Sequence, residues 1–235
     1  MKMKWQDIDV SHDRMCFLYD GKPIFNKRFI EVLKFHAPGL APVQDKTGWY
    51  HIDIMGNPIY AKRYLKAFGY YFNRGAVVDE AGWLHLKDNG KPAYKERYLW
   101  CGNYQEGFCT VRNHDNKYFH IDLQGNRLYK RNFNYVGDFK EGVACVRLDT
   151  GHYVHINKQG RKLNDGVFYD LGVFHKGYAT ARDTKGWFHI NRRGQELYKL
   201  RFQSIEPFYN GFALVVTFDG QKLIINEAGE LILKI

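Results

Sequence analysis

Residues 186–198 read GWFHINRRGQELY, and related stretches recur along the whole chain of 235 residues. The copies read GWYHIDIMGNPIY from Gly48, GWLHLKDNGKPAY from Gly82, NKYFHIDLQGNRLY from Asn116 and GHYVHINKQGRKL from Gly151. The histidines that align in these copies are His51, His85, His120, His155 and His189, at spacings of 34, 35, 35 and 34 residues. Degenerate copies place Cys16 and Ile224 at this anchor position, which makes seven tandem repeats with anchors near 16, 51, 85, 120, 155, 189 and 224. We therefore expect one repeat domain over residues 1–235.

The composition is that of a folded β-protein. The chain is 45% hydrophobic and 17% aromatic, and Tyr and Phe, with 17 residues each, favour strands. No apolar run reaches the roughly 18–20 residues that a membrane-spanning helix needs. The N-terminal MKMKWQDIDVSHDR has no apolar segment of the kind found in secretory signals.

The cysteines and the charge bear on location and partners. Four cysteines show no CxxC pairing, and Cys109 and Cys145 align with Ala or Thr in other copies, so we expect small buried residues and a reducing cytoplasm. The net charge of +10 favours an acidic partner: nucleic acid, a membrane surface or an acidic protein. Because the basic residues are spread through every copy, a solvated outer face is the competing explanation, and no nucleic-acid motif is present.

Each repeat is predicted to form four short strands. These are an Arg-Tyr/Phe segment such as RYLKAF from Arg63, a small-residue strand such as GVACV from Gly142, the anchor strand and a short piece such as QELY. A turn glycine, which tolerates positive φ, follows each anchor by five residues. These glycines are Gly21, Gly56, Gly90, Gly125, Gly160, Gly194 and Gly229.

A unit of 34–35 residues cannot bury two apolar faces alone, so the repeats must stack on one another. The small-residue strand, suited to a crowded axis, favours a seven-bladed β-propeller, and the alternative is an open solenoid of β-hairpins. The first copy lacks a clear first strand unless Met1–Trp5 supplies it. Two stretches depart from the pattern: Phe68–Val78, where we expect an altered hairpin, and Asn164–Phe168, where we expect a shortened or kinked fourth strand.

The units resemble WG repeats, which are named for the Trp-Gly or Gly-Trp pair. GWYHID, GWLHLK and GWFHIN carry the resemblance, together with EGFCTV, EGVACV and KGYATA, and it covers roughly Asp13 to Ile235. FHKGYATARDTKGWFHINRRGQELYKLRF is also similar to the repeat region that precedes a methyltransferase domain in some bacterial proteins. That resemblance implies a non-catalytic module beside an enzyme, but this chain has no glycine-rich loop for S-adenosylmethionine.

The anchor histidines and the tryptophans are weighed as sites. Imidazoles in successive repeats lie too far apart to share a metal ion, so backbone hydrogen bonding is the preferred explanation for residues such as His51, His85 and His189. Core packing is likewise preferred over an aromatic platform for sugars for Trp49, Trp83 and Trp187.

The leading candidate site is a column of three arginines. Arg112, Arg147 and Arg182 each follow a turn glycine by five residues in successive copies, and three guanidinium groups suit phosphate or carboxylate. The competing explanation pairs them with nearby acids such as Asp149 or Asp183.

Acids such as Asp53, Asp122 and Asp183 are expected to be turn residues, and no nucleophile, metal or nucleotide signature occurs. We therefore expect no enzyme and no cofactor. The leading hypothesis is a binding module for a protein or anionic ligand. The alternatives are a substrate-positioning auxiliary domain of a methyltransferase and a carbohydrate-binding module.

Overall fold

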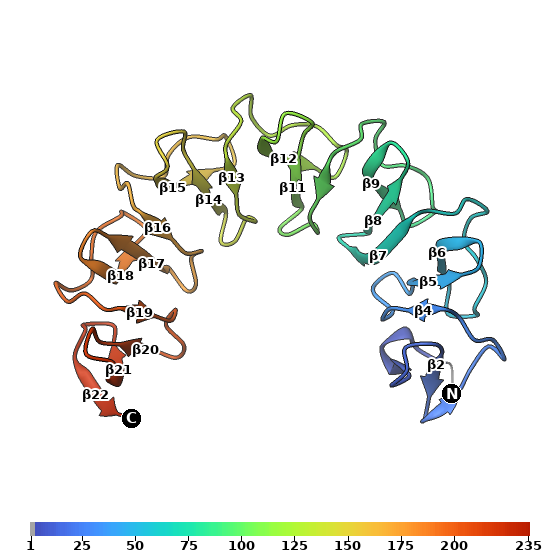
Figure 1. Cartoon of the computed structure of the whole chain (residues 1–235), viewed down its shortest axis with the longest axis horizontal. Coiled ribbons are helices and arrows are strands. Elements are labelled where there is room, and N and C mark those ends of the chain that lie inside the picture. The colour runs from blue at the N-terminus through green and yellow to red at the C-terminus, as the bar shows by residue number, and fades with distance from the viewer. Residues whose placement is uncertain (1–2) are drawn as a thin grey trace. The chain divides into compact units, whose positions relative to one another are not determined.

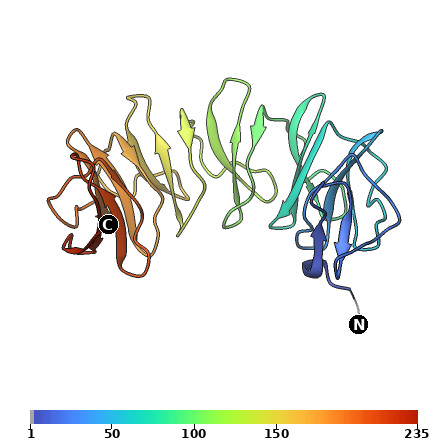
Figure 2. The ribbon, with the colours of Figure 1, turned by 60° about the horizontal axis from the view of Figure 1, so that its bottom comes forward.

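The computed structural model describes residues 3–235 and is all-β apart from one 3-10 helix, η1 (Trp5–Asp7). Met1 and Lys2, part of the proposed first strand, lie outside the described residues. Trp5 begins η1, so Met1–Trp5 does not form the expected strand as a whole. Figures 1 and 2 show each repeat as its own small group of short strands.

The described chain forms two compact units, residues 3–116 with 121–127 and residues 117–120 with 128–235. The first unit contains three complete sheets: β1 (Ile8–Val10), β2 (Phe17–Tyr19) and β3 (Lys22–Pro23); β4 (Glu31–Val32), β5 (Ala41–Asp45) and β6 (Gly48–Ile52); β7 (Lys66–Tyr71), β8 (Arg74–Asp79) and β9 (Gly82–Lys87). The next sheet contains β10 (Trp100–Cys101), β11 (Phe108–Arg112) and β12 (Tyr118–Asp122), and the boundary between the units passes through β12.

The second unit contains three further sheets: β13 (Tyr135–Val136), β14 (Val143–Arg147) and β15 (Tyr153–Asn157); β16 (Asp170–Leu171), β17 (Tyr178–Asp183) and β18 (Gly186–Asn191); β19 (Ser204–Ile205), β20 (Phe212–Val216), β21 (Lys222–Asn226) and β22 (Leu231–Lys234). Strand order follows the sequence in every sheet, and neighbouring strands pair antiparallel, as in β14–β15, β17–β18 and β20–β21. The small residues of the second strand are its buried part: Ala144, Cys145 and Val146 are each 3% exposed or less.

The predicted fourth strand is present only in part. In five repeats the segment after the turn glycine makes two isolated bridges to the anchor strand instead of a continuous ladder. In the sixth repeat these bridges join Ile190 to Glu196 and Trp187 to Phe202. Among the described residues, only the first and last sheets contain this segment as a strand, β3 and β22.

The anchor of the first repeat is Phe17, one residue after the predicted Cys16. Asp20 and Gly21 form a two-residue turn with φ of 49° and 71°, so the strand is one residue shorter before the turn than in the other repeats. The Phe17 ring lies 4.8 Å from that of Phe35, as His51 lies 4.8 Å from Tyr70. The shorter turn moves the buried position by one residue.

The two irregular stretches differ from expectation in informative ways. The hairpin within Phe68–Val78 is altered, because β7 is longer than other first strands and carries a bulge between Ala67 and Tyr70. Its turn, however, is formed by Phe72 and Asn73, with φ of 52° and 56°, while Gly75 pairs inside β8. The segment after Gly160 keeps both of its bridges, from Ile156 to Lys162 and from Tyr153 to Phe168, so its course matches that of the other repeats.

Candidate functional site

The anchor histidines join each repeat to the next one. His189 makes a hydrogen bond from Nδ1 to the Tyr198 hydroxyl at 2.5 Å and from Nε2 to the Glu206 carbonyl oxygen at 2.9 Å. Tyr198 belongs to the same repeat, whereas Glu206 follows the first strand of the next sheet. Since a carbonyl only accepts, Nε2 carries the proton and Nδ1 accepts from the tyrosine. The same two bonds recur at His51, His85 and His120.

His155 keeps only half of this arrangement. Its Nε2 donates to the Gly172 carbonyl at 2.8 Å, but Asn164 replaces the tyrosine. Nδ1 is buried and has no hydrogen-bond partner among residues 3–235. The Asn164 side chain instead accepts from the Gly166 N–H and donates to the Arg192 carbonyl.

Burial keeps all five imidazoles neutral. Desolvation lowers the pKa of each to about 4, and the hydrogen bond to the carbonyl offsets only part of this effect. These contacts and the burial of the rings are those expected of structural histidines. Within the part of the chain that the structure describes, no group of three His, Cys, Asp or Glu residues is arranged to hold a metal ion.

The three tryptophans have different environments. Trp49 is 2% exposed, and the Lys66 ammonium lies 3.8 Å from its ring centroid. Trp83 stacks on Phe68 with ring centroids 5.0 Å apart and an interplanar angle of 16°. Trp83 also lines a smaller pocket, of about 190 Å³, with Phe68 and Trp100. Trp187 borders a groove that also contains Arg182, so Trp187 is a candidate for binding.

The arginine column occupies equivalent strand ends in three sheets. In register, Arg112 lies opposite Trp100, Arg147 opposite Tyr135 and Arg182 opposite Asp170. Arg147 donates from Nε to the Gly151 carbonyl, whereas the Arg182 guanidinium lies 5.9 Å from the Trp187 ring centroid. Arg182 of this column lies beside a groove of about 320 Å³.

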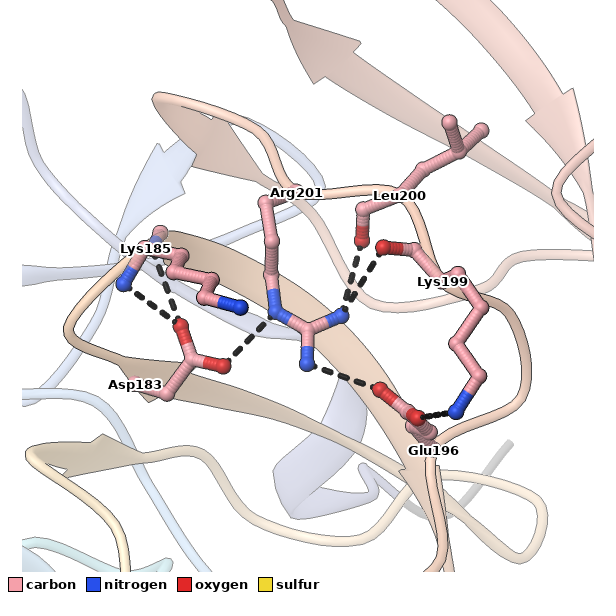
Figure 3. Close-up of polar contacts among 7 residues, drawn as sticks. Asp183, Lys185, Glu196, Lys199, Leu200 and Arg201 are labelled. Carbon is pink, nitrogen blue, oxygen red and sulfur yellow. Dashed lines mark hydrogen bonds and ion pairs between the residues drawn. The ribbon is translucent and has the colours of Figure 1, made fainter.

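The acids expected to neutralise the column have other partners. Asp183 accepts from Arg201 Nε at 2.8 Å, and Figure 3 shows the Arg201 guanidinium between the carboxylates of Asp183 and Glu196. Asp149 forms its ion pair with Lys117 at 3.6 Å. Among the described residues no carboxylate lies within ion-pair distance of Arg147 or Arg182, so the proposed pairing is wrong for these two arginines.

Asp183 holds a tight turn as predicted. Its Oδ1 accepts from the N–H groups of Lys185 and Gly186 at 2.8 and 3.1 Å. Partial burial acts to raise the pKa of Asp183, but the hydrogen bonds from Arg201 and the Lys185 N–H outweigh it and lower the pKa. Asp183 is therefore a carboxylate at the groove whose oxygens are already engaged by Arg201 and by backbone N–H groups. Asp53 and Asp122 also hold turns, and each accepts from the N–H groups two and four residues ahead.

The groove lies within the second unit and has a volume of about 320 Å³. Its aromatic side chains are Tyr169, Trp187, Phe202 and Phe218, and its cationic side chains are Arg182 and Lys185. Tyr169 and Phe218 are 50% and 64% exposed. The groove thus combines two cations with exposed aromatic rings, an arrangement suited to anions that carry carbon surface.

Sequence reasoning found Arg182 and Trp187 but missed Tyr169, Lys185 and Phe218. Lys185 stands in the turn of the Gly-Trp hairpin, where repeat alignment treats the residue as variable. Phe218 lies in the three-residue loop closed by the Thr217 N–H bond to the Gln221 carbonyl, outside the repeat pattern. The one sequence signal for this position was a phenylalanine in an otherwise polar turn, where an aromatic residue is expected to be exposed.

Four cysteines are free and buried, including Cys109 and Cys145, which confirms the small buried residues expected at those two positions. Burial raises the pKa of the Cys145 thiol to about 12. No helix in residues 3–235 combines the length and apolar character needed to cross a membrane.

Comparison with known proteins identifies the repeats. Residues 121–149 and 187–220 match the family model described as WG containing repeat. The chain therefore carries WG-containing repeats in these segments, as the resemblance predicts. No curated protein matches the chain in sequence.

Three solved structures share the fold over most of the chain. A eukaryotic initiation factor matches with a TM-score of 0.61 and 10% identity over 97% of this chain and 72% of its own. The computationally designed Ika8 protein matches with 0.51 and 10% over 97% and 83%, and BamB from Moraxella catarrhalis with 0.50 and 13% over 94% and 76%. BamB is a β-propeller protein, and identities this low describe the fold alone: an all-β chain of propeller-like repeats, as predicted.

Proposed function

We propose that this chain of WG-containing repeats is a non-catalytic binding module that holds an acidic segment of a partner protein in the groove beside Trp187. The observation that carries the proposal is the coincidence, in one groove, of Arg182 and Lys185 with the exposed rings of Tyr169 and Phe218. The groove draws on two repeats, with Tyr169 and Trp187 from one and Phe218 from the next.

The charge of the groove favours a carboxylate-bearing ligand. Asp183 is engaged by Arg201 and by two backbone N–H groups, and among residues 3–235 no ion pair joins Arg182 or Lys185 to a carboxylate, although Asp170 lies opposite Arg182 in register. The net charge of +10 adds a long-range attraction for acidic partners, which raises association rates at low salt.

The size and lining of the groove favour part of an extended chain. A volume of about 320 Å³ is at the lower end of the range for small-molecule pockets, roughly 300–1,000 Å³. Tyr, Trp and Arg are the side chains that contribute most to binding energy at protein interfaces. An acidic segment that inserts an aromatic or aliphatic side chain between Tyr169 and Phe218, with carboxylates on Arg182 and Lys185, uses every feature of the groove.

Binding of Glu- and Asp-rich peptides, measured by fluorescence anisotropy, tests the proposal. We expect Arg182→Glu combined with Lys185→Glu to weaken binding about tenfold or more, because both attractive charges become repulsive. Arg193→Glu is the matched control, since Arg193 is exposed and lies outside the groove. Equal affinities of the wild type and the double variant at low salt would overturn the proposal.

The two alternative functions predict different ligands for the same groove. A carbohydrate-binding module would bind neutral glycans through Trp187 with little dependence on salt or on Arg182. An auxiliary domain of a methyltransferase would bind that enzyme, and an acidic segment of the enzyme would then be the ligand. A glycan panel and a methyltransferase pull-down, each with the double charge variant, distinguish these outcomes.

A further inference from the structure

A second pocket, here called the Trp100 pocket, lies within the first unit and between the third and fourth sheets. It has a volume of about 190 Å³, and all the residues that line it belong to that unit. β7 contributes Phe68, β9 contributes Trp83, and β10 begins with Trp100. Gly102 and Asn103, which follow β10, also line the pocket. Three aromatic side chains therefore meet at one small hollow.

Two of these three rings are not explained by the repeat. The carbonyl that accepts from the anchor histidine belongs to Phe68 in the second repeat and to a glycine in each of the next three. That hydrogen bond needs only a carbonyl, so the phenylalanine ring is an addition. The first-strand position of Trp100 is occupied in the next three repeats by Tyr135, Asp170 and Ser204. The repeat fold therefore requires an aromatic ring at neither position.

The three rings leave part of their surface accessible. Phe68 stacks on Trp83 with ring centroids 5.0 Å apart, and both residues are half-buried. The Trp100 ring lies over Gly102, where an added Cβ would be 3.1 Å from the indole. Trp100 is 36% exposed. Because Gly102 has no side chain, the pocket stays open beside the indole.

The polar groups of the Trp100 pocket are uncharged. Among the described residues, no acidic or basic side chain lines it, and Arg112, opposite Trp100 in register, lies outside the lining. Asn103 is exposed, and its side-chain amide makes no hydrogen bond to residues 3–235. An amide offers two donors and one acceptor oxygen, and each indole offers one donor. The pocket therefore suits a neutral ligand that carries hydrogen-bonding groups.

Size and charge narrow the class of ligand further. A volume of about 190 Å³ is below the roughly 300–1,000 Å³ of pockets that enclose drug-sized ligands, so the pocket holds about one ring. Nucleic acids gain much of their affinity from phosphates on cationic side chains, which this lining lacks. A pyranose ring has a face of C–H groups that packs on an aromatic ring and hydroxyls that need donors and acceptors. Aromatic faces beside a free amide match both properties.

We propose that the Trp100 pocket binds one pyranose ring of a neutral carbohydrate, with the C–H face of the sugar on Trp100 and a hydroxyl bonded to the Asn103 amide. Phe68 and Trp83 supply the other aromatic wall. This site is separate from the acidic-segment groove, because the two share no residue and the groove belongs to the second unit. Either site can therefore be tested, and can fail, without the other.

Chemical-shift mapping with the methyl glycosides of glucose, galactose, mannose and N-acetylglucosamine tests the proposal. At least one of these sugars should cause saturable shifts of the Trp83 and Trp100 indole N–H signals and of the Asn103 side-chain amide, with an affinity in the millimolar range. Trp100→Ala should weaken that binding about tenfold or more by removing the stacking surface. The matched control is Trp187→Ala, which removes the same side chain from the acidic-segment groove and should leave the sugar affinity unchanged.

Asn103→Ala provides a second variant in case Trp100→Ala disturbs folding. It changes an exposed side chain and should weaken sugar binding about threefold to tenfold by removing a hydrogen bond. Adenosine and N-acetylphenylalanine amide stand for the other occupants, a nucleobase and a protein side chain. Saturation of the same signals by either of these two, but by no glycoside, would overturn the proposal. So would sugar binding that neither variant weakens, or no saturable shift up to about 100 mM of each sugar.

Discussion

A buried histidine that bonds its own repeat through Nδ1 and the next repeat through Nε2 is a structural residue, and the pKa values of these histidines follow from that role. At His189 both nitrogens are used, and the ring also lies 3.8 Å from that of Phe208. The imidazole is neutral and surrounded by apolar groups. Protonation requires Nδ1 to stop accepting from Tyr198 and places a charge in the core.

The stability of the protein should therefore depend on pH. Burial lowers the pKa of the five anchor histidines to about 4, from 6.5 in the unfolded chain. Between these values the unfolded chain binds more protons, so stability is fully present above about pH 6.5 and falls as the pH drops toward about 4. Each histidine contributes a slope of up to about 1.4 kcal/mol per pH unit. Urea denaturation across this range measures it, and a free energy of unfolding that stays constant would contradict the buried neutral state.

The substitution Asn164→Tyr should stabilise the protein. A tyrosine there supplies the hydroxyl that His155 Nδ1 lacks and a ring over Gly194, as Tyr129 supplies for His120 and Gly160. We expect a gain of about 1 kcal/mol in the free energy of unfolding, the usual net value of one buried hydrogen bond. In a His155→Phe background the gain should largely disappear. A full gain in that background would show that the hydroxyl–imidazole bond is not its cause.

Two physical reasons explain why each hairpin has a glycine at its turn: the positive φ and the close contact with a tyrosine ring. A matched pair of variants measures the two effects separately. Gly125 and Gly107 have φ of 86° and 82°, but only Gly125 receives a tyrosine ring. Gly107→Ala should cost about 1 kcal/mol for the positive φ, and Gly125→Ala about 1–3 kcal/mol more for displacing the ring. Thermal and urea unfolding measure the loss in the free energy of unfolding for both variants. Equal losses would show that contact with the tyrosine ring is not a reason for the glycine.

The repeat elements were predictable where length was regular. The period, the anchor strands and the turn glycines follow from spacing, because one unit must present the same faces to each neighbour. The prediction failed by one residue at Cys16, since a two-residue turn shortens the strand and moves Phe17 into the buried position. Within Phe68–Val78 the hairpin is altered as predicted, but spacing could not place its turn at Phe72 and Asn73, which adopt positive φ without a glycine. Local turn chemistry decides such positions, and the repeat average hides it.

Across the whole molecule, the repeat scaffold follows from residue spacing, whereas part of the candidate site comes from turns that vary between repeats. Arg182 and Trp187 were predictable because they occupy repeat positions, whereas Phe218 and Lys185 come from turns that vary between copies. The groove forms only when Phe218 of one repeat reaches Gly186 of the repeat before it, where an added Cβ would lie 2.8 Å from the phenylalanine ring. No spacing rule encodes that approach. A single domain over residues 1–235 and the closed ring of seven blades remain predictions.

Amide chemical-shift mapping with a Glu-rich peptide tests whether the groove beside Trp187 binds acidic segments, because it reports on every repeat at once. We expect saturable shifts concentrated at Tyr169, Arg182–Trp187, Gln203 and Phe218, with loss of these shifts at high salt. Shifts centred on the repeats of Trp49 and Trp83, or no saturable shifts at low salt, would contradict it.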